Sequence, residues 1–201
     1  MDSITRHRYP QGMTLVELLV VLAIMSILGV AIYNLFATHN RQALIREETA
    51  LMQQELLSAM TSMADSIRMC GYSPNTNATD NFGFTPITNQ TQINCTQDAD
   101  GNGTFDGSDN EITTFYFNAT TNSIQKFSTG TVPWQPLAIN IGDLQFTYLD
   151  ADGNVISDPN ANLESIRMVQ INATAIPSSN RANMGIRNRT MTTVVQVRNA
   201  K

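Results

Sequence analysis

The sequence predicts an α+β protein in which a long N-terminal α-helix, half transmembrane and half amphipathic, packs on an antiparallel β-sheet head. Two observations support this fold class. Residues 12–36 read GMTLVELLVVLAIMSILGVAIYNLF and contain one charged side chain, and helical spacing of apolar residues continues after them as far as Met69. From residue 111 onward, apolar residues alternate with a period of two, which is typical of β-strands.

The apolar segment, residues 13–36, is long enough to cross a bilayer, because a hydrocarbon core about 30 Å thick needs roughly 20 helical residues. Its single charged residue is Glu17. An ionisable group near the bilayer centre costs on the order of 3 kcal/mol, so such residues are candidates for function. The alternative is that Glu17 lies close enough to the headgroups to remain hydrated. Arg6 and Arg8 precede the segment and predict that this end stays in the cytoplasm.

Two positions in this region are candidates for cleavage by a signal peptidase. Cleavage after Ala31 would follow small residues, but the apolar run continues beyond it, which makes that site weak. Cleavage after Gly12 would instead remove a leader, residues 1–12, and leave the apolar helix at the new N-terminus. Glu17 would then be the fifth residue of the mature chain and would lie close to the new amine of Met13.

Residues 37–70 are predicted to continue the helix as its amphipathic half. Five large apolar residues recur at intervals of three or four and indicate a buried stripe: Met52, Leu56, Met60, Met63 and Ile67. The methionines are predicted to fill a core rather than to bind a cofactor. Gly71 and Pro74 are the stop signals expected at the end of a helix.

Residues 71–201 are predicted to form a β-rich head. Its first part, residues 73–110, is rich in Asn, Thr, Asp and Gly and is expected to be a long loop region. The strand candidates follow as a hairpin of residues 111–118 and 123–128, a second hairpin of residues 143–149 and 154–156, and two strands at 165–176 and 189–199. Sequential strands joined by turns predict one antiparallel meander that covers the apolar stripe of the helix.

The two cysteines, Cys70 and Cys95, lie just before and within this loop region. In an exported chain, an even number of cysteines favours a disulfide. The bridge would close a loop of about 25 residues and would add roughly 3 kcal/mol to the free energy of unfolding. Two separate buried thiols are the alternative, and no second thiol or histidine lies nearby in the sequence to complete a metal site with this pair.

The segment DADGNGTFDGSD, residues 98–109, resembles a twelve-residue calcium loop. Calcium takes about six to eight oxygen ligands, which side chains at alternate positions around a glycine can supply. The candidate ligands are Asp98, Asp100, Asn102, Thr104 through its backbone carbonyl, Asp106 and Asp109. The last position holds aspartate rather than glutamate and no amphipathic helix flanks the loop, so a solvated turn is the alternative. The related DADGN of residues 150–154 is predicted to be a plain hairpin turn.

Composition argues against two classes of function. The net charge is −5 and most acidic residues lie after residue 79, whereas a nucleic-acid-binding surface needs a basic patch. After residue 12 the only histidine is His39, and no nucleophile, base and orienting group form a recognisable catalytic set. We therefore expect neither a nucleic-acid partner nor an enzyme.

Gly12 followed by MTLVELLVVLAIMSILG resembles the class III signal of type IV pilins and of type II secretion pseudopilins. The resemblance implies that a prepilin peptidase cleaves after Gly12 and methylates Met13. It also implies that Glu17, unpaired in the monomer, neutralises the N-terminal amine of a neighbouring subunit during assembly. Two features depart from the family pattern: Met13 replaces the phenylalanine common in major pilins, and the helix lacks their usual proline kink.

Weaker matches extend over most of the chain. The stretches SIRMCGY, IGDLQFTYLDADGNV, LESIRMVQINATAI and TTVVQVRN resemble minor pilins of the PilW kind. This resemblance implies a low-copy structural subunit that initiates or primes pilus assembly at the tip, with other minor and major pilins and the inner-membrane assembly platform as partners. It also implies a chain held in the bacterial inner membrane before assembly and in the pilus afterwards, with a periplasmic or extracellular head.

Two alternatives remain open. A J-like minor pseudopilin of a type II secretion system shares the signal and the long helix. A membrane-anchored, calcium-dependent adhesin would bind its ligand at residues 98–109, and Trp134 would belong to that surface unless it anchors a loop. Loss of pili after a change of Glu17 would favour assembly. Loss of ligand binding with intact pili, after changes of Asp98 and Asp100, would favour adhesion.

Overall fold

A computed structural model describes residues 12–86, 88–106, 111–130 and 134–199 of the chain. Contacts divide the chain into two compact units, residues 1–45 and residues 46–201. One long helix, α1 (Leu15–Met69), begins in the first unit and ends in the second.

The described part of the first unit consists mainly of α1, and its large apolar side chains are exposed. Polar side chains in this stretch bond to the helix backbone. The Ser26 hydroxyl donates to the Ala23 carbonyl (2.8 Å), and the Thr38 hydroxyl donates to the Asn34 carbonyl (2.8 Å). Such bonds satisfy hydroxyl groups without water. Among the described residues, α1 is the one helix long and apolar enough to cross a membrane.

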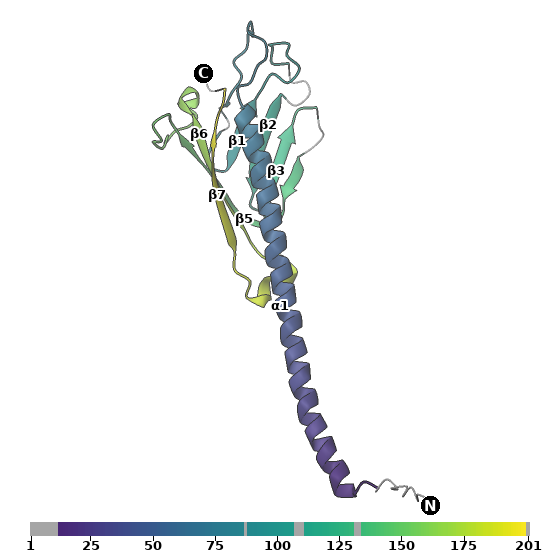
Figure 1. The fold of residues 1–201 in the computed structure, drawn as a ribbon. Coiled ribbons are helices and arrows are strands. Elements are labelled where there is room, and N and C mark those ends of the chain that lie inside the picture. Colours follow the sequence, from purple (N-terminus) through teal and green to yellow (C-terminus); the bar gives the residue numbers. More distant parts are fainter. Residues whose placement is uncertain (1–11, 87, 107–110, 131–133, 200–201) are drawn as a thin grey trace, which may run out of the picture. The chain divides into compact units, whose positions relative to one another are not determined.

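The second unit combines the rest of α1 with two antiparallel sheets (Figure 1). Sheet A has the strand order β1-β2-β3-β4, and these strands span Gln92–Thr96, Ile112–Asn118, Ser123–Ser128 and Gln135–Ala138. Sheet B has the order β5-β6-β7, and its strands span Ile141–Leu149, Met168–Ala175 and Arg189–Gln196. Two short 3-10 helices, η1 (Leu163–Ser165) and η2 (Ser179–Met184), precede β6 and β7.

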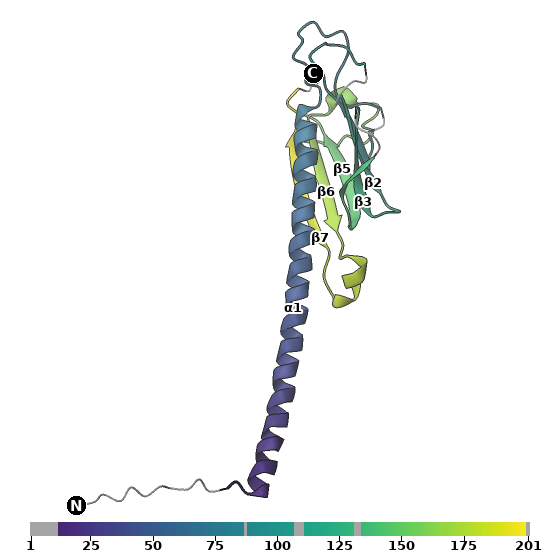
Figure 2. The same ribbon diagram turned by 90° about the vertical axis from the view of Figure 1, so that its right-hand side faces the viewer.

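One hydrophobic core fills the second unit. The stripe predicted on the helix is buried in it: Met52, Leu56, Met60, Met63 and Ile67. Figures 1 and 2 together show both sheets on the same side of the helix. Alternate strand residues complete the core, for example Val169, Ile171 and Ala173 of β6. A long helix packed on antiparallel sheets is the predicted α+β fold, which the structure confirms.

The sheets differ from the single predicted meander. β1 lies inside the segment predicted to be a loop region. The sequence does not predict this strand because QINCT is too short to show a clear period of two. It pairs with β2, and its Ile93 and Cys95 enter the core. β4 is a second unpredicted strand, and its Pro136 argues locally against a strand although prolines are tolerated at sheet edges such as this one.

The first predicted hairpin is confirmed, whereas the second has its turn but only a single bridge in place of a paired second strand. β2 pairs with β3, with Asn118 opposite Ser123. After β5, the chain forms a single bridge between Leu149 and Val155, and β5 pairs instead with β6 from Ile141 to Leu149. β6 buries alternate side chains over eight residues, so it offers β5 far more paired surface than a three-residue strand. β6 and β7 confirm the last two predicted strands.

The end of α1 is fixed to sheet A. Gly71 has φ = 78°, a conformation that favours glycine, and its N–H donates to the Thr96 carbonyl (2.9 Å). A Cβ atom on Gly71 would lie 2.7 Å from the carbonyl oxygen of Asn199. The adjacent Cys70 forms a disulfide with Cys95 of β1, with a Cα–Cα distance of 5.4 Å. The predicted disulfide is therefore present, and it joins the helix to the first strand.

Candidate functional site

The predicted processing segment lies directly before α1. Gly12 and Met13 are exposed and outside the helix. Among the described residues other than Gly12 and its chain neighbours, no heavy atom lies within 4 Å of the position of a Cβ on Gly12. A peptidase that cuts after Gly12 therefore meets an open backbone in the described part of the chain.

Glu17 forms a capping box with Thr14 at the start of α1. Its Oε2 accepts hydrogen bonds from the Thr14 N–H (2.9 Å) and the Thr14 hydroxyl (3.0 Å). The Glu17 N–H donates in return to Thr14 Oγ1 (3.3 Å). Reciprocal bonds of this kind satisfy N–H groups that a helix leaves without partners in its first turn, where the helix dipole also favours a carboxylate.

Glu17 has hydrogen-bond partners in the monomer, because Thr14 binds its carboxylate, but no ion pair with a cation is found for it among the described residues. The T-x-x-E spacing of these two residues is the sequence signal that predicts the capping box. Glu17 nevertheless remains exposed. An amine from another subunit would therefore have to share this carboxylate with Thr14 or replace it.

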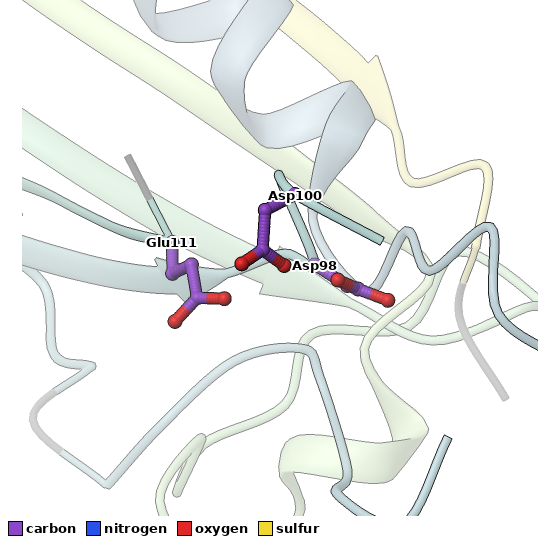
Figure 3. A group of neighbouring side chains, drawn as sticks. All are labelled: Asp98, Asp100 and Glu111. Atoms are coloured by element: carbon purple, nitrogen blue, oxygen red, sulfur yellow. The ribbon is translucent and has the colours of Figure 1, made fainter. Parts of the chain in front are cut away.

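Three carboxylates from the segment between β1 and β2 lie close together, as Figure 3 shows. Oxygen atoms of Asp98, Asp100 and Glu111 all lie within 4.8 Å of one another. Asp98 and Glu111 are fully buried (0% exposed), whereas Asp100 is exposed. Asp98 and Asp100 follow β1, and Glu111 directly precedes β2. The two ends of the segment are thus brought together by the pairing of β1 with β2.

Hydrogen bonds fix the position of Asp98. The Ser73 hydroxyl donates to its Oδ2 (2.6 Å), the Gly101 N–H donates to its Oδ1 (2.8 Å), and its own N–H donates to the Tyr72 carbonyl (2.8 Å). The bond from Ser73 lowers the pKa of Asp98 most, burial raises it, and the backbone N–H groups of Gly103 and Gly101 lower it further. The net effect is a pKa below the ordinary value, so Asp98 is a carboxylate at neutral pH.

The other predicted calcium ligands surround this cluster unevenly. The Asn102 amide Nδ2 donates to Asp100 Oδ2 (2.8 Å) and to Asp106 Oδ2 (3.2 Å), and so holds these two carboxylates together. Asn102 Oδ1 accepts bonds from the N–H and the hydroxyl of Thr104 (2.7 and 2.8 Å). Asp109 lies outside the described residues.

Glu111 is a site residue that the sequence reasoning missed. The twelve-residue frame ends at Asp109, so Glu111 is assigned there to the following strand. In the structure its Oε2 accepts the N–H of Asp106 (3.2 Å), which places its carboxylate against the loop. Two oxygens on opposite sides of a calcium ion lie about 5 Å apart, twice the metal–oxygen distance, so the 4.8 Å grouping has dimensions that fit this ion.

The pentapeptide DADGN occurs twice in the chain, at residues 98–102 and 150–154. The second copy forms the predicted turn: Asp150 Oδ1 accepts the N–H groups of Asp152 (2.9 Å) and Asn154 (2.8 Å). Within the described ranges, the one group of three acidic, histidine or cysteine side chains close enough to share an ion is at the first copy. The two copies differ because Glu111 adds a third carboxylate to the first copy, whereas the pentapeptide is the same in both.

A further buried carboxylate, also missed, joins α1 to η2. Glu48 is 6% exposed; its Oε1 accepts the Ser178 N–H (2.7 Å) and its Oε2 lies 3.2 Å from an Arg181 guanidinium nitrogen. Arg181 also lies 3.4 Å from Glu47. The bond from the Ser178 N–H is the main reason why the pKa of Glu48 is lowered. Its partners are 130 or more residues away in the sequence, so no local pattern predicts them.

Trp134 packs on two strands of sheet A. Its ring centroid lies 6.0 Å from that of Tyr116 on β2 and 5.5 Å from that of Phe127 on β3. The side chain is 42% exposed. The contacts agree with the interpretation of Trp134 as a loop anchor, with part of the ring open to solvent.

Two family models match the chain. Residues 7–33 match the prokaryotic N-terminal methylation motif, and residues 46–197 match prepilin peptidase-dependent protein B. The first match includes the predicted cleavage position and Glu17, and the second includes the buried stripe of α1 and both sheets. No curated protein matches the chain. The chain therefore belongs to the prepilin peptidase-dependent protein B family of type IV pilin-like proteins.

Proposed function

We propose that this chain is a low-copy minor pilin that primes the assembly of a type IV pilus and is placed at the filament tip. Its partners are other minor and major pilins, the prepilin peptidase and the inner-membrane assembly platform. The head faces the periplasm before assembly and the exterior afterwards. Support for this role comes from the methylation motif and the prepilin peptidase-dependent head within one chain.

The observation that carries the proposal is the start of α1. Cleavage after Gly12 would create an amine at Met13, four residues before the exposed carboxylate of Glu17. The apolar side chains that follow are exposed and need to be covered, by lipid before assembly and by the helices of other subunits afterwards. A carboxylate and an amine at the start of such a helix give each subunit a charged contact at a fixed position along the helix.

The first experiment determines the N-terminus of the protein from its native membrane, by intact mass and N-terminal peptide sequencing. We expect a chain that begins with methylated Met13. A chain that begins at Met1 would contradict prepilin processing and would leave a plain membrane anchor.

We predict that Glu17→Leu leaves processing unchanged and reduces incorporation of the subunit into pili at least tenfold. The apolar substitution removes the carboxylate that would meet the amine of a neighbouring subunit. Immunogold counting on sheared pili measures incorporation, and Glu164→Leu, at an exposed residue of the head, is the matched control. Equal incorporation of both variants would count against a role of Glu17 in assembly.

We also propose that the loop 98–111 binds a structural calcium ion through Asp98, Asp100 and Glu111, with Asn102, Thr104, Asp106 and Asp109 as further candidate ligands. Support comes from the alternating oxygen-bearing side chains and from the close grouping of three carboxylates, two of them buried. A calcium ion would neutralise the negative charge of these neighbouring carboxylates. It would also hold the segment between β1 and β2 in one conformation.

We predict that 10 mM calcium raises the melting temperature of the full chain in detergent by several degrees. A millimolar dissociation constant would give about 1.4 kcal/mol at this concentration. Glu111→Gln should abolish the shift. Asp150→Asn with Asp152→Asn, in the second DADGN copy, should leave it intact. An unchanged melting temperature of the unmodified chain, or an equal shift with magnesium, would contradict a calcium site.

A further inference from the structure

β7 forms an open edge of sheet B (Figures 1 and 2). The Val197 N–H donates to the Arg167 carbonyl (2.9 Å), so the odd-numbered residues of this strand bond to β6. The even-numbered residues direct their backbone groups to the outer edge: Thr190, Thr192, Val194 and Gln196. All four are exposed, and among the described residues none makes a backbone hydrogen bond to them from that side.

Charge is distributed unevenly along the head. Residues 71–164 contain eleven acidic residues and one lysine, whereas residues 165–201 contain six basic residues and no acidic one. Arg187 and Arg189 lie at the start of β7, Arg198 lies just after its end, and all three are exposed. In the described part of the chain, none of these arginines forms a salt bridge. The open edge is therefore basic in a protein that is acidic as a whole.

These arginines have two opposite effects on strand pairing. Basic side chains at both ends of an exposed edge repel a second basic edge, which is a common protection against self-association of strands. The same charges attract an acidic strand and orient it during the encounter. The β7 edge thus excludes copies of itself and favours a partner of opposite charge.

A groove of about 240 Å³ lies between α1 and β7. Leu57, Thr61 and Arg68 line it from the helix, and Met191 and Thr193 line it from the strand. Leu57, which lines this groove, is 57% exposed. A strand added beside β7 would direct alternate side chains toward this groove.

We propose that the β7 edge, residues 187–198 with the adjoining groove, binds an extended acidic segment of another filament subunit by strand addition. Backbone hydrogen bonds to Thr192 and Val194 supply the pairing, and carboxylates of the segment bind the arginines at either end. An apolar side chain of the same segment covers Leu57. This contact is separate from helix assembly at the N-terminus, and it rests on the proposed function only in placing the partner among filament subunits.

The test uses the full chain in cells that make the filament, with the photo-crosslinker p-benzoylphenylalanine in place of Thr192. Membranes are irradiated before pili are sheared off, and the adduct is digested and sequenced by mass spectrometry. We expect a peptide from another subunit with an excess of aspartate and glutamate. Arg187→Glu with Arg189→Glu, and separately Val194→Pro, should lower the adduct yield at least tenfold.

Val194→Pro removes an N–H that points outward and leaves the bonds to β6 in place, because proline is tolerated at such edge positions. Val194→Thr and Lys126→Glu are the matched controls and should retain the adduct. Full adduct in both the proline and the arginine variants would overturn the proposal. So would an adduct to lipid, to a second β7, or to a peptide without net negative charge.

The two proposals fail in different ways. A chain that gives the acidic adduct in the membrane but never enters pili would contradict the assembly role alone. A chain that enters pili without the acidic adduct would contradict strand addition at β7 alone.

Discussion

Glu48 shows how a single buried carboxylate links distant parts of the chain. Its partners, the Ser178 N–H and Arg181, belong to the segment around η2, and their bonds lower its pKa below the ordinary value of 4.5. A lowered carboxyl pKa in the folded state stabilises the fold at pH values above 4.5. This stabilisation is lost as the pH falls through the lower folded value.

We predict that Glu48→Gln lowers the free energy of unfolding at pH 7 by about 2 kcal/mol. The amide oxygen can still accept the Ser178 N–H, but the negative charge that strengthens this bond and pairs with Arg181 is lost. The difference between the two proteins should shrink as the pH falls below about 4.5. Urea unfolding of the full chain at several pH values measures both effects. The control is Glu47→Gln, whose exposed pair with Arg181 should contribute less than about 1 kcal/mol. A difference that does not vary with pH would contradict the assigned titration.

At the level of residues, local patterns in the sequence predict where a residue lies in the fold better than they predict which residues it contacts. The five apolar residues of the stripe are buried as their spacing predicts. Glu17 is placed correctly at the start of the helix, but its partner Thr14 was missed although it is visible as T-x-x-E. Glu48 and Glu111 give no local signal, because each is buried by residues that folding brings together.

Gly71 fixes the junction between the helix and the head. Its φ of 78° disfavours any residue with a side chain, and the Asn199 carbonyl oxygen would lie 2.7 Å from a new Cβ. We predict that Gly71→Ala lowers the free energy of unfolding by about 2 kcal/mol or more. Gly153→Ala is the control, since Gly153 has a similar φ of 84° and open space around it. Equal thermal shifts in the two variants would show that the close contact with Asn199 contributes nothing.

At the level of elements, length decides what the sequence reveals. α1 and β6 are long enough for their periods of 3.6 and two to be read directly. β1 and β4 have five and four residues, and their assignment depends on the neighbouring strands that pair with them. The way the two sheets are joined also depends on long-range bonds that no local pattern indicates. One of them runs from the Phe146 N–H of β5 to the Gln90 carbonyl just before β1 (2.7 Å).

At the level of the whole molecule, the disulfide and the core are expected to act together. We predict that Cys70→Ala with Cys95→Ala lowers the free energy of unfolding by about 3 kcal/mol through the greater freedom of the unfolded chain. Both cysteines are buried, and the alanines remove only their sulfur atoms from the core. Calorimetry of the full chain, oxidised and reduced, gives the same comparison without substitution. Equal melting temperatures in both states would contradict this stabilisation.

The same disulfide decides where a pulling force would enter the head. A load transmitted along α1 reaches Cys70 at the end of the helix and passes through a covalent bond directly into β1. Residues 71–94, which lie between the two cysteines, are then excluded from mechanical extension. Their extended length, at about 3.4 Å per residue, would be about 85 Å. Under tension, a reduced chain could release this segment, whose last residues belong to β1 and would have to leave sheet A. The oxidised chain would transmit the force without releasing it.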